Sequence, residues 1–91
     1  MTQDSGLPAS TQIDPAAVAA TIHDVWAEVL EAETIEPQTH FFDAGGHSVA
    51  AMRVMIRLRR EWDVALPTRL IFDQPVLADF TSATSAILTA G

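Results

Sequence analysis

The spacing of the apolar residues is the feature that most restricts how this chain can fold. Between residues 14 and 32 they recur at intervals of three and four, at Val18, Ile22, Val25, Trp26, Val29 and Leu30. That interval is typical of an α-helix with one buried face. Segments 48–62 and 76–88 have the same period, and no stretch alternates apolar and polar residues over a useful length. The chain is therefore predicted to be all-α.

Local signals indicate where the helices begin and end. Asp14 and Pro15 are typical of a helix start, because Asp accepts a free backbone N–H and Pro loses nothing at the first position. Thr68 is predicted to cap a short helical turn at residues 70–72. The resulting fold is a small four-helix bundle with three main helices, one short third helix and a long loop between helices 1 and 2. That loop, at about residues 33–47, is long enough to suggest a function.

The length and the cysteine content exclude several classes of protein. A chain of 91 residues supports one modest core and leaves little room for a deep catalytic cleft. The absence of cysteine excludes a disulfide framework, a thiolate zinc site and a cysteine nucleophile. We expect residues 1–13 to form a flexible lead or linker and residues 14–91 to form one domain.

The sequence contains no targeting or membrane signal of the usual kinds. No stretch approaches the roughly 20 apolar residues that span a bilayer. The N-terminus has neither the basic residue nor the apolar core of a secretory signal. We expect a cytoplasmic monomer that does not bind membranes.

Charge is distributed unevenly along the chain. The net charge is −7, yet residues 48–70 contain all five basic residues, each an arginine, against only two acids. An acidic chain is a poor general binder of nucleic acid, because affinity for duplexes comes largely from neutralising phosphates. The local excess of arginine is either a solvated helix face or a surface that attracts an acidic partner or a phosphate.

The predicted second helix has two apolar stripes when its residues are placed at 100° per step. One stripe is expected to face the core and comprises Ala51, Met55, Leu58 and Trp62. The other comprises Val49, Met52 and Ile56, with Arg53, Arg57 and Arg60 beyond it. This second stripe is either additional core beneath the long loop or an exposed docking patch, since exposed apolar patches rimmed by charge usually bind a partner.

The junction between the long loop and the second helix has the strongest local pattern. Gly45 and Gly46 let the backbone turn sharply, and Ser48 falls at or next to the helix N-cap. There its hydroxyl lies near free N–H groups and the positive end of the helix dipole, which suits a serine that carries a phosphate ester. The alternative is that Ser48 is only a helix cap. Phe41 and Phe42, in the same loop, are expected to pin it to the core.

Two enzymatic interpretations of the same residues fail on spacing. A serine hydrolase elbow needs G-x-S-x-G after a strand, but Ala50 occupies the second glycine position and no strand is predicted. A metal site built on His23, His40 and His47 lacks a recognised ligand spacing such as H-E-x-x-H. We therefore expect no catalytic residue and no metal.

A longer run of residues carries a resemblance to a known family. Residues 41–53 read FFDAGGHSVAAMR, and they are followed by LRREW at 58–62, VALP at 64–67 and LIFDQP at 70–75. This pattern resembles the peptidyl carrier proteins, which are the thiolation domains of nonribosomal peptide synthesis within the acyl carrier protein family. The resemblance covers about residues 14–88 and combines the loop, the serine and the downstream helices.

The resemblance implies a fold, a cofactor and a set of partners. The family folds as a four-helix bundle with a short third helix. Its functional serine, matched by Ser48 and flanked by Gly46 and His47, receives 4′-phosphopantetheine from coenzyme A through a phosphopantetheinyl transferase. The arm then carries an aminoacyl or acyl group as a thioester between an adenylation enzyme and condensation, thioesterase or tailoring enzymes. Carriers of this family are not catalysts, and the resemblance implies that residues 14–91 form the carrier domain.

Some residues depart from the family pattern and leave alternatives open. Many members have leucine where Ala44, Val49 and Ala50 stand here, which is expected to alter the docking patch. Fatty-acid-type carriers typically have Asp before the serine and an acidic second helix, so His47 and the arginines favour the peptidyl branch. The docking hypothesis assigns the partner surface to Val49, Met52 and Ile56, with Arg53 and Arg57 at its rim. The alternatives are a polyketide or fatty-acid acyl carrier, and a helical module that binds acidic protein or nucleic acid.

Overall fold

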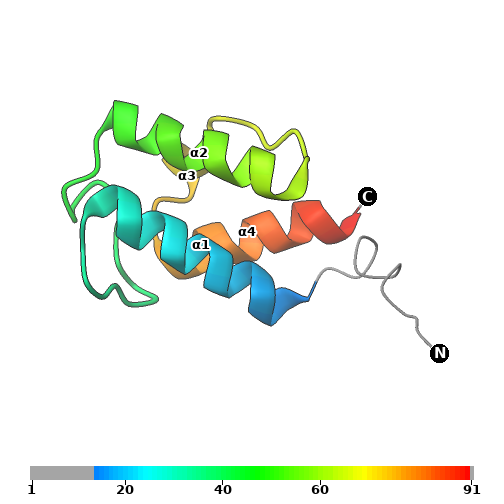
Figure 1. Cartoon of the computed structure of the whole chain (residues 1–91), viewed down its shortest axis with the longest axis horizontal. Helices are drawn as coiled ribbons and strands as arrows, with labels where there is room; N and C mark the ends of the chain where they lie inside the picture. The colour runs from blue at the N-terminus through cyan, green and yellow to red at the C-terminus, as the bar shows by residue number, and fades with distance from the viewer. Residues whose placement is uncertain (1–13, 91) are drawn as a thin grey trace.

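The computed structural model describes residues 14–90 as a four-helix bundle (Figure 1). The helices are α1 (Pro15–Leu30), α2 (Ser48–Trp62), α3 (Leu70–Asp73) and α4 (Leu77–Ala90). Helix α1 packs against both α2 and α4, and the short α3 contacts α2 and α4. Over these residues there is no strand, so the all-α prediction is confirmed. The flexible lead predicted for residues 1–13 lies outside the described residues, as does Gly91.

The start of α1 follows the sequence prediction. The Asp14 carboxylate accepts the backbone N–H of Ala16 at 3.0 Å, and Pro15 is the first helical residue. The helix ends at Leu30, two residues before its expected end, because Glu31 adopts a left-handed conformation with φ of 56°. The 16 residues of α1 do not form a helix long enough to span a membrane, and neither does any other helix in the described part of the chain.

The connection from α2 to α3 corrects one prediction. Helix α3 begins after Arg69, and no side chain caps it. The Thr68 hydroxyl instead accepts a hydrogen bond from the guanidinium of Arg59. The same guanidinium donates through Nε to the Leu66 carbonyl at 2.8 Å. The prediction that Thr68 caps the short helix is therefore wrong, because Arg59 engages its hydroxyl while tying this connection to α2.

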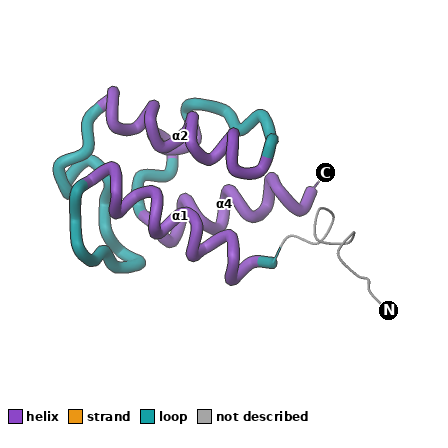
Figure 2. Tube along the Cα trace, in the orientation of Figure 1, coloured by secondary structure: helices purple, strands orange, loops and turns teal. Residues whose placement is uncertain are grey.

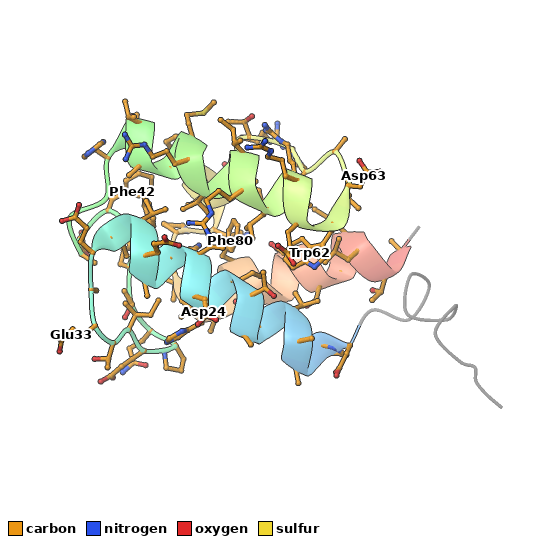
Figure 3. The ribbon with its side chains drawn as sticks, viewed as in Figure 1. Asp24, Glu33, Phe42, Trp62, Asp63 and Phe80 are labelled. Atoms are coloured by element: carbon orange, nitrogen blue, oxygen red, sulfur yellow. The ribbon has the colours of Figure 1, made fainter. Side chains whose placement is uncertain are left out.

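The core forms around Trp26, which has no exposed surface. Its ring lies 5.1 Å from the ring of Phe41 and 5.4 Å from that of Phe80, between centroids. The predicted core stripe of α2 is buried, except that Trp62 is half-buried near the end of the helix (Figure 3). Val54, which neither stripe included, is also fully buried.

The long loop between α1 and α2 lies across one end of the bundle (Figure 2). Phe41 is fully buried and Phe42 is half-buried, which confirms that the two rings pin the loop to the core. The backbone is also anchored, because the N–H of Phe41 donates to the Pro75 carbonyl at 2.7 Å. In the other direction, the N–H of Leu77 donates to the Thr39 carbonyl at 2.9 Å. The loop therefore enters α2 from a fixed position.

Candidate functional site

Ser48 is the first residue of α2, and its side chain is exposed. The N-cap is His47, whose Nδ1 accepts the backbone N–H of Ala50 at 3.3 Å and whose carbonyl accepts that of Ala51 at 2.8 Å. Ser48 therefore lies next to the N-cap, one of the two positions expected for it. His47, expected to flank the attachment serine, is the residue that performs the capping. This arrangement leaves the Ser48 hydroxyl free of a capping role.

Glycine suits the two positions 45 and 46, which precede His47 and Ser48, for different structural reasons. Gly45 has φ of +105°, a conformation that side-chain-bearing residues rarely adopt. Gly46 sits against Phe41, where an added Cβ would overlap the ring and lie 2.7 Å from the Phe41 carbonyl oxygen. The Gly46 N–H donates to that same oxygen at 3.0 Å. The buried Phe41 thereby sets the path of the backbone that leads to Ser48.

The N-terminus of α2 offers the environment that a phosphodiester needs. The first N–H groups of a helix have no partner within the helix, and here His47 accepts only those of Ala50 and Ala51. The N–H groups of Ser48 and Val49 make no hydrogen bond to any other residue in the 14–90 range. Two free donors and the positive end of a 15-residue helix dipole thus lie beside an exposed hydroxyl. These residues fit a phosphate group joined to Ser48 Oγ.

The second apolar stripe of α2 lies on the surface. Exposed fractions are 59% for Val49, 39% for Met52 and 44% for Ile56, and we call these three residues the α2 patch. Of the two interpretations left open by the periodicity, an exposed patch is the one that the structure shows. Arg53 and Arg57 flank the patch and are also exposed, and Arg57 forms an ion pair with Glu28 of α1.

One exposed aromatic residue was not predicted from the sequence. Phe72 of α3 is 41% exposed, and its ring stacks on that of Phe42 with 5.4 Å between centroids. Phe42 in turn contacts Phe41, at 5.2 Å. An aromatic row therefore runs from the α3 surface through the loop to the core. Helix α3 has only four residues, so its periodicity is too short to show which of them faces solvent.

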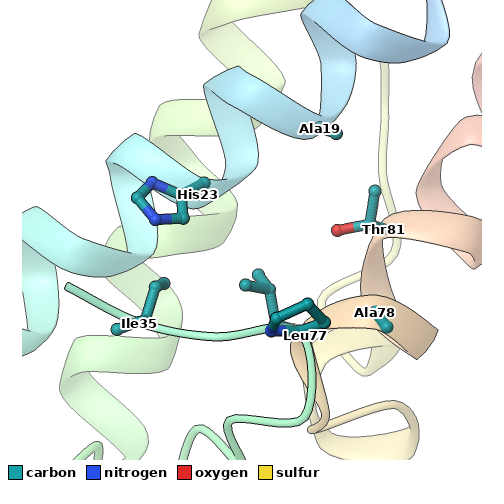
Figure 4. Close-up of a pocket in the computed structure, with 7 residues that line it drawn as sticks. Ala19, His23, Ile35, Leu77, Ala78 and Thr81 are labelled. Atoms are coloured by element: carbon teal, nitrogen blue, oxygen red, sulfur yellow. The ribbon is translucent and has the colours of Figure 1, made fainter.

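The three histidines lie at separate places. His47 caps α2, while His40 accepts the N–H of Asp43 through Nδ1 at 3.3 Å. His23 lies beside Ile35 and Leu77 at a largely apolar cavity of about 330 Å³ between α1, the long loop and α4 (Figure 4). Within residues 14–90, no group of three or more histidine or carboxylate side chains is placed to hold a metal ion.

Residues 20–83, which include the whole site, match a protein family described as the phosphopantetheine attachment site. The chain belongs to this family. The match covers α2, α3, most of α1 and the first half of α4. It confirms the resemblance drawn from the sequence, and it identifies 4′-phosphopantetheine as the cofactor of this carrier protein.

Individual relatives point to the peptidyl branch of the family. The chain is 35% identical over 74 residues to one of the linear gramicidin synthase proteins of Brevibacillus parabrevis. That alignment spans 81% of this chain but only 2% of the synthase protein. The carrier is therefore similar to one small part of a much longer protein.

Solved structures agree with the fold. BlmI, a type-II acyl carrier protein from Streptomyces verticillus involved in bleomycin biosynthesis, is 27% identical with a TM-score of 0.78. The alignment covers 90% of this chain and 99% of BlmI. A peptidyl carrier protein solved with the phosphopantetheine transferase Sfp and coenzyme A is 30% identical, with a TM-score of 0.70. That alignment covers 76% of this chain and 90% of the relative.

Proposed function

We propose that Ser48 is the residue that receives 4′-phosphopantetheine, and that the holo-protein carries an aminoacyl group in peptide biosynthesis. The observation that carries this proposal is the geometry at the start of α2. An exposed hydroxyl, released from capping by His47, lies beside the two free N–H groups of Ser48 and Val49. Gly46 and His47 complete the attachment motif by fixing the loop and the helix end.

The chemistry of attachment follows from this geometry. Ser48 Oγ attacks the β-phosphorus of coenzyme A in the active site of a transferase. The phosphoanhydride bond breaks, adenosine 3′,5′-bisphosphate leaves, and the hydroxyl proton passes to a base of the transferase. The N–H groups of Ser48 and Val49 then stabilise the negative phosphodiester at the helix N-terminus.

The carrier performs no turnover of its own in this proposal. When bound, 4′-phosphopantetheine supplies a terminal thiol that holds the cargo as a thioester. The protein contributes tethering, which raises the effective concentration of the cargo at each partner enzyme. Ser48 and its loop present the arm, and the bundle behind them keeps the attachment point in place. No described residue is assigned a catalytic role.

The α2 patch is the proposed docking surface for the partners. Val49, Met52 and Ile56 follow Ser48 along one exposed face, so an enzyme that reaches Ser48 also meets the patch. Arg53 and Arg57 at its rim favour partners with acidic surfaces. We assign to this surface a phosphopantetheinyl transferase, an adenylation enzyme, and condensation, thioesterase or tailoring enzymes. The relative solved with Sfp supports the first of these.

The proposed cargo is an amino acid rather than a fatty acyl chain. Similarity to linear gramicidin synthase supports this assignment, as do His47 before the serine and the five arginines between residues 48 and 70. An acyl carrier of the polyketide or fatty-acid type is the nearer alternative. A helical module that binds acidic protein or nucleic acid through the arginine face is the more distant one.

Intact-protein mass spectrometry tests the assignment of Ser48. Incubation with coenzyme A and a permissive phosphopantetheinyl transferase should add one phosphopantetheinyl unit to the protein. Ser48→Ala should abolish the gain, whereas Ser82→Ala, at an exposed serine on α4, should leave it intact. A folded protein that gains no mass beside a positive control for the transferase would make Ser48 an ordinary helix residue. Binding to a nonspecific duplex at moderate salt would instead support the interaction module.

A further inference from the structure

A second cavity, of about 290 Å³, lies between α1 and α2. It differs from the apolar cavity near His23 because its walls combine charged and apolar side chains. The wall at the end of α1 comprises Glu28, Val29 and Glu31. The wall from α2 comprises Arg53, Ile56 and Arg57. Since Ile56 also belongs to the α2 patch, the cavity is continuous with the surface that begins at Ser48.

The charges in this cavity are only partly paired. Arg57 and Glu28 form an ion pair that links the two helices across the cavity. Glu31 and Arg53 form no ion pair within residues 14–90. Val29 and Ile56 supply apolar surface beside these two charges. The cavity thus offers a carboxylate, a guanidinium and an apolar surface to one small ligand.

Glu31 has an unusual backbone for a residue of its type. Its φ of 56° is left-handed, and at the end of a helix that conformation is usually taken by glycine or asparagine. Its N–H donates to the Glu28 carbonyl at 3.1 Å, so the turn is fixed. The conformation places a glutamate at the cavity where glycine would be less strained. Asp63 adopts the same conformation at the end of α2, so in both places the left-handed residue ends the helix.

The cavity is within reach of an arm attached to Ser48. Ile56 lies eight residues along α2 from Ser48, which is about 12 Å at the helical rise. The phosphopantetheine chain has 13 bonds between phosphorus and sulfur. An extended chain gains about 3.5 Å for every three bonds, so the arm spans about 15 Å. Its thioester end can therefore meet the cavity by lying along the α2 patch.

We infer that this cavity holds the aminoacyl end of the loaded arm. The inference rests on the proposed function, because it requires the arm on Ser48. The cargo's ammonium group binds the Glu31 carboxylate, and its side chain lies against Val29 and Ile56. Arg53 donates a hydrogen bond to an amide carbonyl of the arm. The ligand is thus a small aminoacyl thioester with a free amino group, and an N-acylated or fatty acyl cargo lacks the contact with Glu31.

Methyl-resolved NMR of the loaded carrier tests this inference. The probe is the stable amide analogue of L-valyl-phosphopantetheine, transferred to Ser48 from the corresponding coenzyme A derivative. The expected result is a chemical-shift change at the methyl groups of Val29 and Ile56 relative to the holo-protein. The N-acetyl-L-valyl probe, which has no ammonium group, should lose most of that change. This comparison requires no substitution and so does not depend on how a variant folds.

A pair of conservative variants isolates the carboxylate. Glu31→Gln should lose most of the shift change with the L-valyl probe, whereas Glu33→Gln, at an exposed residue outside the cavity, should retain it. Loading without a shift at Val29 and Ile56 would overturn the inference. Equal shifts from the free and the N-acetylated amine would also overturn it. A failure to load, seen directly as the absence of a mass gain, would refute the proposed function and this inference with it.

Discussion

Substituting Gly46 by alanine should lower the free energy of unfolding by about 1–3 kcal/mol, the usual cost of overfilling a packed site. The new Cβ would overlap the ring of Phe41 and lie 2.7 Å from its carbonyl oxygen. The ring is fully buried against Trp26, and the oxygen already accepts the Gly46 N–H at 3.0 Å. Neither neighbour can withdraw without disturbing the core or the loop. The loop must therefore shift, and Ser48 shifts with it.

Chemical denaturation in urea measures this cost, because a single domain of this size is expected to unfold in one step. Gly45→Ala is the matched control. Nothing lies within 4 Å of a Cβ built there, so its penalty comes from φ of +105° rather than from a clash. The two variants should differ in their dependence on Phe41. Replacing the Phe41 ring by a smaller side chain, in Phe41→Leu, should reduce the loss of stability caused by Gly46→Ala. It should leave the loss caused by Gly45→Ala unchanged.

A double-mutant cycle gives the decisive number. We expect a coupling energy of about 0.5–3 kcal/mol between Gly46→Ala and Phe41→Leu, the range for residues in contact. The double variant should be more stable than the sum of the two single losses of stability predicts. The rate of phosphopantetheinylation should fall with Gly46→Ala as the loop shifts. A Gly46→Ala protein as stable as the wild type would refute the argument that Phe41 fixes the approach to Ser48. A coupling of zero would show that only the backbone contact matters.

The remaining predictions concern the two faces and the cap of α2. Ile56→Asp should leave the protein folded but slow its loading by an adenylation partner, because Ile56 is exposed in the α2 patch. Met55→Ala, one residue away and fully buried, should instead cost about 2–5 kcal/mol in denaturation. If Ile56→Asp unfolds the protein or loads normally, the docking assignment is wrong. His47→Ala should cost about 1 kcal/mol, the usual value of an N-cap side chain, and His47→Asn should restore it; equal stability of all three proteins would remove His47 from this role.

Periodicity predicted most of the fold because the bundle is built from contacts that repeat along each helix. The boundaries of α2 agree with the expectation, and α1 ends two residues early. The early end depends on Glu31 taking a left-handed conformation, which its residue type does not favour. Thr68 was assigned to a cap by local preference, but a residue nine positions earlier, Arg59, engages its hydroxyl. At Thr68, a contact with Arg59 overrides the local preference. At Glu31, an unfavoured backbone conformation does so.

The sequence predicted part of the site in the same way. Glycines and a serine before an amphipathic helix indicate an exposed hydroxyl, and Ser48 occupies that place. Residue preferences for N-caps rank serine highly, so they did not identify His47 as the cap. The cavity that brings Glu31 beside Arg53 depends on how α1 crosses α2. That crossing joins residues 22 positions apart, and no periodicity within one helix reports it.

An exposed apolar patch on a small protein needs protection from self-association, and the arginines around it can provide that protection. Two copies that met through Val49, Met52 and Ile56 would bring Arg53 and Arg57 of each copy close together, at a cost from like charges. A partner enzyme with an acidic rim meets the same patch without that cost. Because the whole chain has a net charge of −7, the arginines also place positive charge beside the patch on a protein that is acidic as a whole. We therefore expect high salt to weaken loading by partner enzymes while favouring contact between copies, and sedimentation at low and high salt would measure the second effect. A carrier that is equally monomeric at low and at high salt would show that the arginines do not prevent self-association through the patch.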